Sequence, residues 1–395
     1  MAFFSSITRY AEGRAAGDRT VLCIILFLHL LFSGTGVLAQ QPGYSWDSGT
    51  EQGRIFKHTP KIAFAIPRHT YGLGVNFQYQ TYGKQEWNQH HGYPLMGFGL
   101  QYFDFGDPEV LGRAISFFPN ITLKLVDRPR WMVHFRVGSG VAWVDRIYDR
   151  IENPDNNSIG SHLNNTTCFR LVGGVELSPR WALFAGGSFT HFSNGAAQMP
   201  NLGINVPAFS ASLRYTPEPL QKQDYVRWDS SKRPPGRWGA TGYFSLSYKE
   251  TSFPGAAKWP VYTGSVSGIY RISKVQTLQG GLDCEYYKSV YVFSLHTLAA
   301  HTPQEARQDA TRYGLFIANE WQFGNTGVLV QAGYYLFRKN YPAPFPLYNK
   351  LGLRYYFPPI SRFSTQFYAG VYMKSHLITA DYISVGIGVR FLQFS

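Results

Sequence analysis

Apolar and polar residues alternate along most of the chain, in segments separated by turn-forming residues. A period of two is typical of β-strands whose two faces meet different surroundings. It predicts strands in the first half over 61–67, 71–81, 95–105, 113–126, 131–148, 166–177, 181–193 and 205–215. It predicts strands in the second half over 239–248, 262–272, 276–287, 311–323, 326–337, 348–357, 364–374 and 382–394. No long helix is expected.

The two faces of the predicted strand 181–193 differ in character. One face carries Trp181, Leu183 and Phe189, whereas the other is smaller and more polar, with Ser188 and Thr190. Segments of about ten residues with an apolar outer face and a small or polar inner face are typical of outer-membrane barrels. A soluble β-sandwich produces a similar period, so the pattern leaves both classes open.

The start of the chain has the layout of a secretory signal. Basic residues at Arg9, Arg14 and Arg19 precede the apolar run 21–32, and small residues then favour cleavage after Ala39. The run is shorter than the about 20 residues that a membrane-spanning helix needs. No later segment is long and apolar enough, so the mature chain is expected to be soluble or a β-barrel.

Composition shifts the balance toward the barrel. Aromatic residues make up 17% of the chain and charged residues only 15%, while the last strand ends in the aromatic-rich "GVRFLQFS". Aromatic side chains form girdles at membrane interfaces. The expected fold is therefore an all-β, transmembrane antiparallel β-barrel of the cell outer membrane. It has about 14–16 strands, and the barrel-assembly machinery is its expected partner during biogenesis.

The chain divides at a segment rich in proline and charge. We expect a signal peptide over 1–39, a first barrel unit over 40–217, a linker or long turn over 218–237, and a second barrel half over 238–395. Weak likeness between the halves suggests that the second is a degenerate repeat. The linker favours two tandem eight-stranded units, but double barrels in one chain are rare, so the expectation is one barrel.

Net charge and the remaining cysteine and histidine residues exclude few classes of function. With 37 Lys and Arg against 24 Asp and Glu, the chain is basic. In an exported β protein this favours the phosphates of anionic lipid or lipopolysaccharide over nucleic acid, or else simply solvates loops. Cys168 and Cys284 are expected to be isolated, and His90 and His91 to be solvated. The sequence predicts no metal site and no cofactor.

One strand end carries candidate chemistry. Residues two apart on a strand share a face, so His191 and Ser193 lie together, and a histidine there can take the proton of a serine nucleophile. A hairpin brings Asn205 beside His191, where its carbonyl can hold the imidazole tautomer. Asn194 and the amides of the Gly195 turn are candidates for an oxyanion site. Alternatively, these are ordinary residues at a strand end.

The stretch "HFSNGAAQMPNLGIN" resembles the motif of the lipid A 3-O-deacylases, the PagL family of outer-membrane esterases. The motif positions match without a gap at His191, Ser193, Asn194, Pro200, Asn201, Gly203 and Ile204. The likeness covers about residues 60–216 and leaves the second half of the chain unexplained.

The resemblance implies that Ser193 is the nucleophile, His191 the base and Asn194 an oxyanion group. It also implies that the site faces the lipid of the outer leaflet, so a catalytic pair can lie on the apolar face of its strand. The expected contacts of the acyl chain are Leu183, Phe189 and Phe209.

The chain departs from the family at one position, because the acidic third member falls on Asn205. A native asparagine serves the same role if its oxygen faces the histidine ring, as in cysteine proteases. Glu176 lies at the far end of the hairpin and cannot substitute. Three acids near the preceding loop remain as alternatives: Asp145, Asp149 and Asp155.

The expected function is therefore an outer-membrane, serine-type ester hydrolase that removes a 3-O-linked hydroxyacyl chain from lipid A. Two alternatives remain. One is a non-enzymatic barrel, porin-like or a surface protein, that retains the motif as structure. The other is an acyl hydrolase that acts on another lipid.

Overall fold

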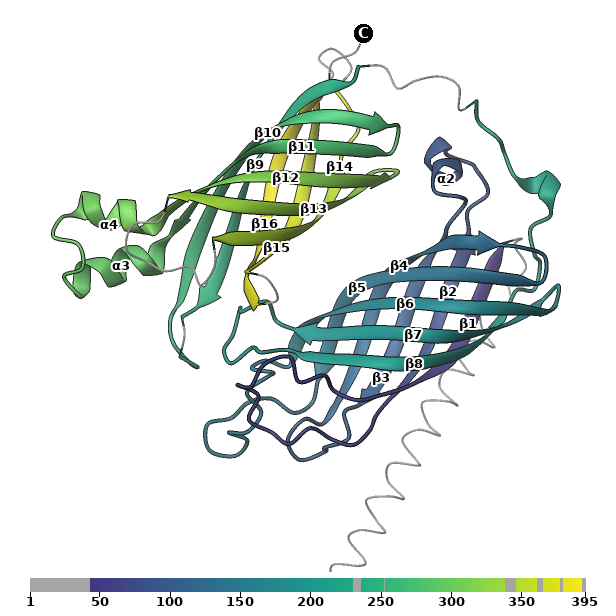
Figure 1. Cartoon of the computed structure of the whole chain (residues 1–395), viewed down its shortest axis with the longest axis horizontal. Helices are drawn as coiled ribbons and strands as arrows, with labels where there is room; N and C mark the ends of the chain where they lie inside the picture. The colour runs from purple at the N-terminus through teal and green to yellow at the C-terminus, as the bar shows by residue number, and fades with distance from the viewer. Residues whose placement is uncertain are drawn as a thin grey trace, which may run out of the picture.

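The chain folds into two closed antiparallel β-barrels in sequence, one from β1–β8 and one from β9–β16 (Figure 1). The computed structural model describes residues 43–229, 236–251, 253–337, 346–360, 365–376 and 379–392. The expected signal peptide lies outside the described residues. The all-β barrel fold is confirmed, whereas the expectation of one large barrel is wrong: each group of eight strands closes on itself, through β1–β8 and β9–β16 pairing.

The strand bounds follow the alternation closely. The first barrel comprises β1 (Tyr44–Gly53), β2 (Thr70–Gln80), β3 (Leu95–Asp104), β4 (Arg113–Asp127), β5 (Trp131–Val144), β6 (Leu163–Ser178), β7 (Trp181–Ser193) and β8 (Ile204–Tyr215). The second comprises β9 (Trp238–Glu250), β10 (Lys258–Ser273), β11 (Gln276–Tyr287), β12 (Thr311–Phe323), β13 (Thr326–Phe337), β14 (Leu347–Tyr356), β15 (Thr365–His376) and β16 (Thr379–Leu392). Short helices connect some of them: α2 (Glu86–His90), η2 (Lys222–Asp224), α3 (Lys288–His296) and α4 (Pro303–Ala310).

The first predicted strand is wrong, because residues 61–67 form a loop and β1 lies upstream of them. Ile62 and Phe64 alternate as in a strand, but both are buried in an apolar cluster that closes one end of the first barrel. β1 escaped notice because its inward positions include Ser45, Asp47 and Glu51, and its outward face is only weakly apolar.

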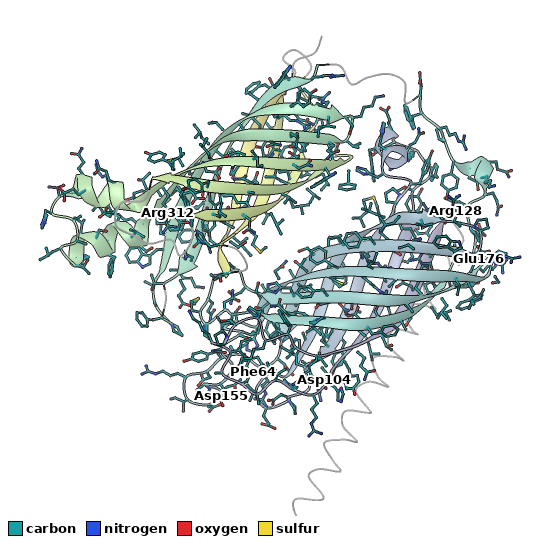
Figure 2. The ribbon with its side chains drawn as sticks, viewed as in Figure 1. Phe64, Asp104, Arg128, Asp155, Glu176 and Arg312 are labelled. Carbon is teal, nitrogen blue, oxygen red and sulfur yellow. The ribbon has the colours of Figure 1, made fainter. Side chains whose placement is uncertain are left out.

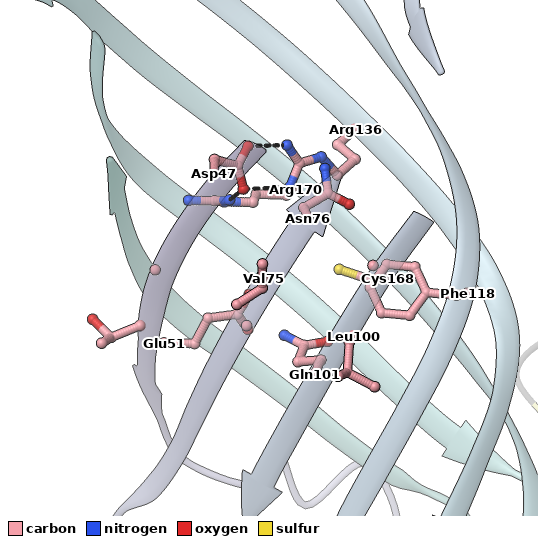
Figure 3. Close-up of a pocket in the computed structure, with 14 residues that line it drawn as sticks. Asp47, Glu51, Val75, Asn76, Leu100, Gln101, Phe118, Arg136, Cys168 and Arg170 are labelled. Atoms are coloured by element: carbon pink, nitrogen blue, oxygen red, sulfur yellow. Dashed lines mark hydrogen bonds and ion pairs between the residues drawn. The ribbon is translucent and has the colours of Figure 1, made fainter. Parts of the chain in front are cut away.

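A network of buried charge fills the middle of the first barrel. The Asp47 carboxylate pairs with Arg136 at 2.5 Å and with Arg170 at 3.8 Å (Figure 3). It also pairs with Arg214 at 3.4 Å. The cavity beside it measures only about 40 Å³, which holds roughly two or three water molecules. An eight-stranded barrel is narrow enough to be filled by its own side chains, and this one is.

An apolar cap lies above this network, at the end of the barrel where β7 finishes. The Phe192 ring packs edge-on against Phe103 and Phe105, with centroids 5.4 Å and 5.3 Å away. Ile204 and Val206 of β8 are fully buried in the same cluster. The cap therefore gives the β7–β8 hairpin a rigid support from inside.

The second barrel is filled in the same way. Lys350 lies 2.8 Å from Asp283 and 3.1 Å from Glu285, and Arg354 lies 2.9 Å from Glu320. Buried tyrosine rings occupy the space between these pairs: Tyr243, Tyr356, Tyr368, Tyr372 and Tyr382. The described interior is thus packed with side chains, which argues against a porin-like channel.

The outer walls of both barrels are apolar. Phe98, Leu171 and Phe209 are exposed on the first, and Phe244, Ile317 and Ile387 on the second. No helix in the described ranges is long and apolar enough to span a membrane.

The barrels also touch one another. On the first barrel, His91 follows α2 and its ring stacks on Phe323 of the second barrel, with centroids 4.2 Å apart. Glu86 of α2 forms an ion pair with Lys274 of the second barrel. At the opposite ends, the loop after β7 contacts β9 and β16. The two barrels therefore meet both at the α2 end and at the end that carries the β7–β8 loop.

Replacing Asp47 with Asn should destabilise the first barrel by about 3–5 kcal/mol, because three buried guanidinium groups lose their shared carboxylate. The unfolding midpoint in urea, followed by the gel mobility of the folded barrel, measures the effect. Asp104→Asn is the matched control, since Asp104 pairs with Arg113 at the partly exposed rim. Equal midpoints for the two variants would contradict the assigned role of Asp47.

Candidate active site

The candidate residues lie on the outer wall of the first barrel, at the last positions of β7. In the strand register, His191 is directly opposite Asn205 of β8, and Ser193 is opposite Asn165 of β6. The hairpin therefore brings together the residues that the sequence analysis placed side by side. Ser193 is 3% exposed, beneath the loop that joins β7 and β8.

A continuous chain of side-chain hydrogen bonds links these residues. His191 Nε2 lies 2.9 Å from Ser193 Oγ, and His191 Nδ1 lies 2.6 Å from Asn205 Oδ1. Asn205 Nδ2 in turn lies 2.9 Å from Nδ1 of His58, in the loop after β1. The Asn205 oxygen therefore faces the His191 ring, the orientation that a supporting asparagine needs. We call these four residues the relay.

The sequence analysis missed His58, and no local signal marks it. It follows β1, which was itself missed, and it reaches the site only because the loop runs along the start of β8. The N–H of Phe56 donates to the Asn205 carbonyl at 2.8 Å, which fixes this approach.

The acidic alternatives are used elsewhere. Asp145 accepts the N–H of Arg113 at 2.6 Å. Asp149 accepts the N–H groups of Glu152 and Ile151, which lower its pKa below the ordinary value. Asp155 lies among the loops, and Glu176 lies at the opposite end of the barrel (Figure 2). In the described part of the chain, His191 has no carboxylate partner.

The turn after Ser193 is tightly organised by Asn194. Its N–H donates to Asn201 Oδ1 at 2.9 Å, and its side-chain amide donates to Ser161 Oγ at 2.9 Å and to the Gln198 carbonyl at 2.8 Å. An oxyanion contact from Asn194 would require one of these bonds to break. Among the described residues, the N–H groups of Gly195 and Ala196 have no acceptor.

The wall around the relay is mostly apolar. Phe209 is 62% exposed and Leu183 is 44% exposed on the same face, with Phe189 half-buried between the strands. A polar patch adjoins Ser193 on the β5–β6 side: Asn165 Nδ2 donates to Ser139 Oγ at 3.0 Å, and Thr167 Oγ1 donates to Asn165 at 2.9 Å. The sequence analysis did not single out this patch, although its members are polar at outward positions.

The other candidate ligands form no site. His91 bonds to the Gln322 carbonyl at 2.9 Å, and both Cys168 and Cys284 are free. Within the described ranges, no group of three potential metal ligands comes together.

Two family models match the chain. Residues 71–214 match the family model described as lipid A 3-O-deacylase (PagL), and residues 238–393 match the model described as acyloxyacyl hydrolase, C-terminal domain. The two segments together span well over half of the 395 residues. The chain belongs to the PagL family. It is therefore a hydrolase-family β-barrel of the outer membrane, and the family resemblance of the motif is confirmed.

Solved structures of outer-membrane barrels show only distant likeness. The crystal structure of the outer membrane enzyme PagL is 17% identical over 42% of this chain and 97% of that chain, with a TM-score of 0.31. CdiB from Acinetobacter baumannii is 12% identical over 89% and 60%, with a TM-score of 0.19. OccAB4 from Acinetobacter baumannii is 9% identical over 90% and 99%, with a TM-score of 0.22. No curated protein sequence matches.

Gly203 is a position where the site has no room for added volume beside the His191 ring. Its φ is +79°, and a Cβ there would lie 2.9 Å from His191 Cε1 and 3.1 Å from the Phe192 carbonyl oxygen. Gly203→Ala should therefore displace the imidazole and lower kcat for a p-nitrophenyl ester by about tenfold to a hundredfold.

Gly187→Ala is the matched control for this experiment, because a Cβ at that outward position of β7 meets nothing within 4 Å. Both variants are compared at equal amounts of folded protein. Full activity in Gly203→Ala would show that the His191 ring tolerates the added methyl group.

Proposed function

We propose that the chain hydrolyses the ester of a 3-O-linked hydroxyacyl chain on lipid A, with Ser193 as nucleophile and His191 as base. The observation that carries this proposal is the unbroken hydrogen-bonded relay on the lipid-facing wall. A serine and a histidine in this arrangement have little structural purpose in hydrocarbon, where polar side chains are costly.

The tautomer of His191 follows from its neighbour. Asn205 Oδ1 can only accept, so Nδ1 of His191 carries the proton and donates it to that oxygen. Nε2 is then unprotonated and accepts the hydrogen bond of Ser193 Oγ. As Oγ attacks the acyl carbonyl, its proton passes to Nε2 and the carbonyl oxygen becomes an oxyanion.

The oxyanion would be stabilised by the turn that follows Ser193. The unpaired N–H groups of Gly195 and Ala196 are the available donors, and Asn194 holds the turn that presents them. Collapse of the tetrahedral intermediate breaks the ester bond, and His191 gives the proton to the departing sugar oxygen, which leaves as a hydroxyl group. Water then attacks the acyl-enzyme by the same route, so the hydroxy fatty acid leaves and Ser193 is restored.

The position of the relay suits a substrate of the outer leaflet. It lies at the end of the barrel where the loops 54–69, 105–112, 145–162 and 194–203 gather. At the opposite end, two of the three hairpin connections are the short turns 128–130 and 179–180, and the third, 81–94, carries α2. Short turns are periplasmic and long loops extracellular in barrels of this class. The acyl chain would then descend along the wall past Leu183, Phe189 and Phe209.

Phospholipids and other glycolipids also carry acyl esters, so the choice of substrate rests on its polar part. The patch of Ser139, Asn165 and Thr167 beside the nucleophile offers hydroxyl and amide groups to a glycolipid. The chain's excess of basic residues favours a phosphorylated substrate such as lipopolysaccharide. Once the barrel-assembly machinery has released the folded chain into the outer membrane, the site would have direct access to lipopolysaccharide.

The test is mass spectrometry of lipid A from cells that express the chain, beside cells that express Ser193→Ala at the same level. The native chain should remove one hydroxyacyl mass, and the variant should remove none. Loss of more than 10³-fold in activity is expected from the variant, since it lacks the nucleophile.

Purified protein with defined substrates separates the alternatives. Release of fatty acid from phospholipid but not from lipid A would change the assigned substrate and keep the chemistry. Unchanged lipids with both chains, in membranes where the barrels are folded, would overturn the proposed activity and leave a non-enzymatic surface barrel.

A further inference from the structure

We propose that His58 is a positioning residue of the relay, which selects the orientation of the Asn205 amide and so the tautomer of His191. This proposal rests on the proposed function and deepens it. An asparagine, unlike a carboxylate, presents two different ends to its neighbour, so its orientation must be chosen by something else.

The two orientations have opposite effects on His191. With Oδ1 toward the ring, Nδ1 is protonated and Nε2 is free to accept the serine proton. With the amide turned over, Nδ2 would donate to an unprotonated Nδ1, and Nε2 would carry the proton instead. That second tautomer cannot act as the base for Ser193.

His58 distinguishes between these orientations because its Nδ1 lies 2.9 Å from Nδ2 of Asn205. The contact is satisfied when Nδ2 donates to an unprotonated ring nitrogen of His58. If the amide turned over, Oδ1 would face Nδ1 of His58, and the contact would survive only if the His58 ring moved its proton from Nε2 to Nδ1, the less stable position in a neutral imidazole in water. His58 thus stabilises the productive orientation.

The backbone holds His58 where this selection requires it. Phe56 N–H donates to the Asn205 carbonyl at 2.8 Å, and Ile55 is buried in the apolar cap. On the other side, the N–H of Ala63 donates to Asn157 at 3.1 Å, and Asn157 donates back to the Lys61 carbonyl at 2.6 Å. The loop is therefore tied at both sides of the histidine.

A pair of substitutions in two backgrounds tests the proposal. His58→Phe keeps a ring of similar size and removes the acceptor, so kcat should fall by about tenfold with KM unchanged. In the Asn205→Glu background the same change should lower kcat by less than about twofold, because both oxygens of a carboxylate accept hydrogen bonds and its orientation needs no selection. An equal loss in both backgrounds would overturn the proposal and leave His58 as part of the loop alone.

A second readout does not depend on activity. The ¹⁵N shifts of the His191 ring should report a protonated Nδ1 in the native chain and a mixture of tautomers in His58→Phe. An unchanged ring in the variant would overturn the proposal. A native chain that shows the expected tautomer but hydrolyses no lipid would sink the proposed function and leave the role of His58 intact.

We also infer, from a separate set of contacts, that Glu250 of the second barrel positions the catalytic turn of the first. Glu250 ends β9 on an outward position, yet it is only 4% exposed, because its carboxylate accepts the N–H of Met199. Ile383 of β16 packs against Gly195, where a Cβ would come within 2.3 Å of its Cδ1. The second barrel thus touches the turn at both its start and its end.

Through these contacts the second barrel positions the turn that follows the nucleophile. The turn carries the unpaired N–H groups of Gly195 and Ala196, so a shift in its position alters the donors available to the oxyanion. A carboxylate that fixes the Met199 N–H restrains the far side of that turn. The barrel acts on the reaction through the loop and touches no reacting atom.

Glu250→Leu should lower kcat by about tenfold and speed amide exchange in residues 194–201, since the Met199 N–H loses its acceptor. Glu250→Gln retains an acceptor oxygen and should stay within about twofold of the native chain. Lys258→Ala is the control, because Lys258 is the strand partner of Glu250 and its side chain is exposed. Unchanged amide exchange in Glu250→Leu would overturn the inference, whatever the activity of the native chain.

Discussion

Every backbone N–H and C=O group inside a bilayer must be paired within the protein, and the whole architecture follows from that constraint. A closed antiparallel sheet meets it, and each of the two sheets in this chain closes through its first and last strands. Closure gives every strand one face toward lipid and one toward a narrow interior. Within the membrane, polar side chains then lie in the packed interior, and a polar site on the lipid-facing wall is an exception.

The interiors show how buried charge is tolerated when it is shared. In the first barrel one carboxylate serves three guanidinium groups, and in the second lysine and arginine alternate with carboxylates and tyrosine hydroxyls. Such networks contribute little net stability compared with an apolar core, but removing one member leaves charge without a partner. They also fill the space that a pore would need.

Much of this was predictable from the alternation of residues. Strands such as β7, β11, β12 and β13 have the bounds that the pattern predicts, because their two faces differ strongly. β1 was missed because it carries the polar residues of the interior network, and the loop 61–67 was taken for a strand because its apolar residues pack into the cap. Closure into two barrels was expected only as the alternative that the linker favoured, since alternation says nothing about which strands meet across the seam.

The residues of the candidate site likewise fall into those that the sequence predicted and those that it did not. His191, Ser193 and Asn205 were found because strand geometry fixes which residues share a face and which pair across a hairpin. His58 and Glu250 were not, because they come from a distant loop and from the other barrel. Their contacts depend on how loops and barrels pack, which leaves no periodic trace in the sequence.

The apolar cap closes the first barrel between its internal cavity and the loops at the end where β7 finishes. The cavity beside Asp47 lies below Phe103, Phe105 and Phe192, and all three rings are fully buried in the cap. A hydrolase needs water as its second substrate, and the buried apolar cap lies between this cavity and the loops at the site's end of the barrel. In the proposed reaction the hydrolytic water would therefore enter from the head-group layer, the same side from which the lipid arrives.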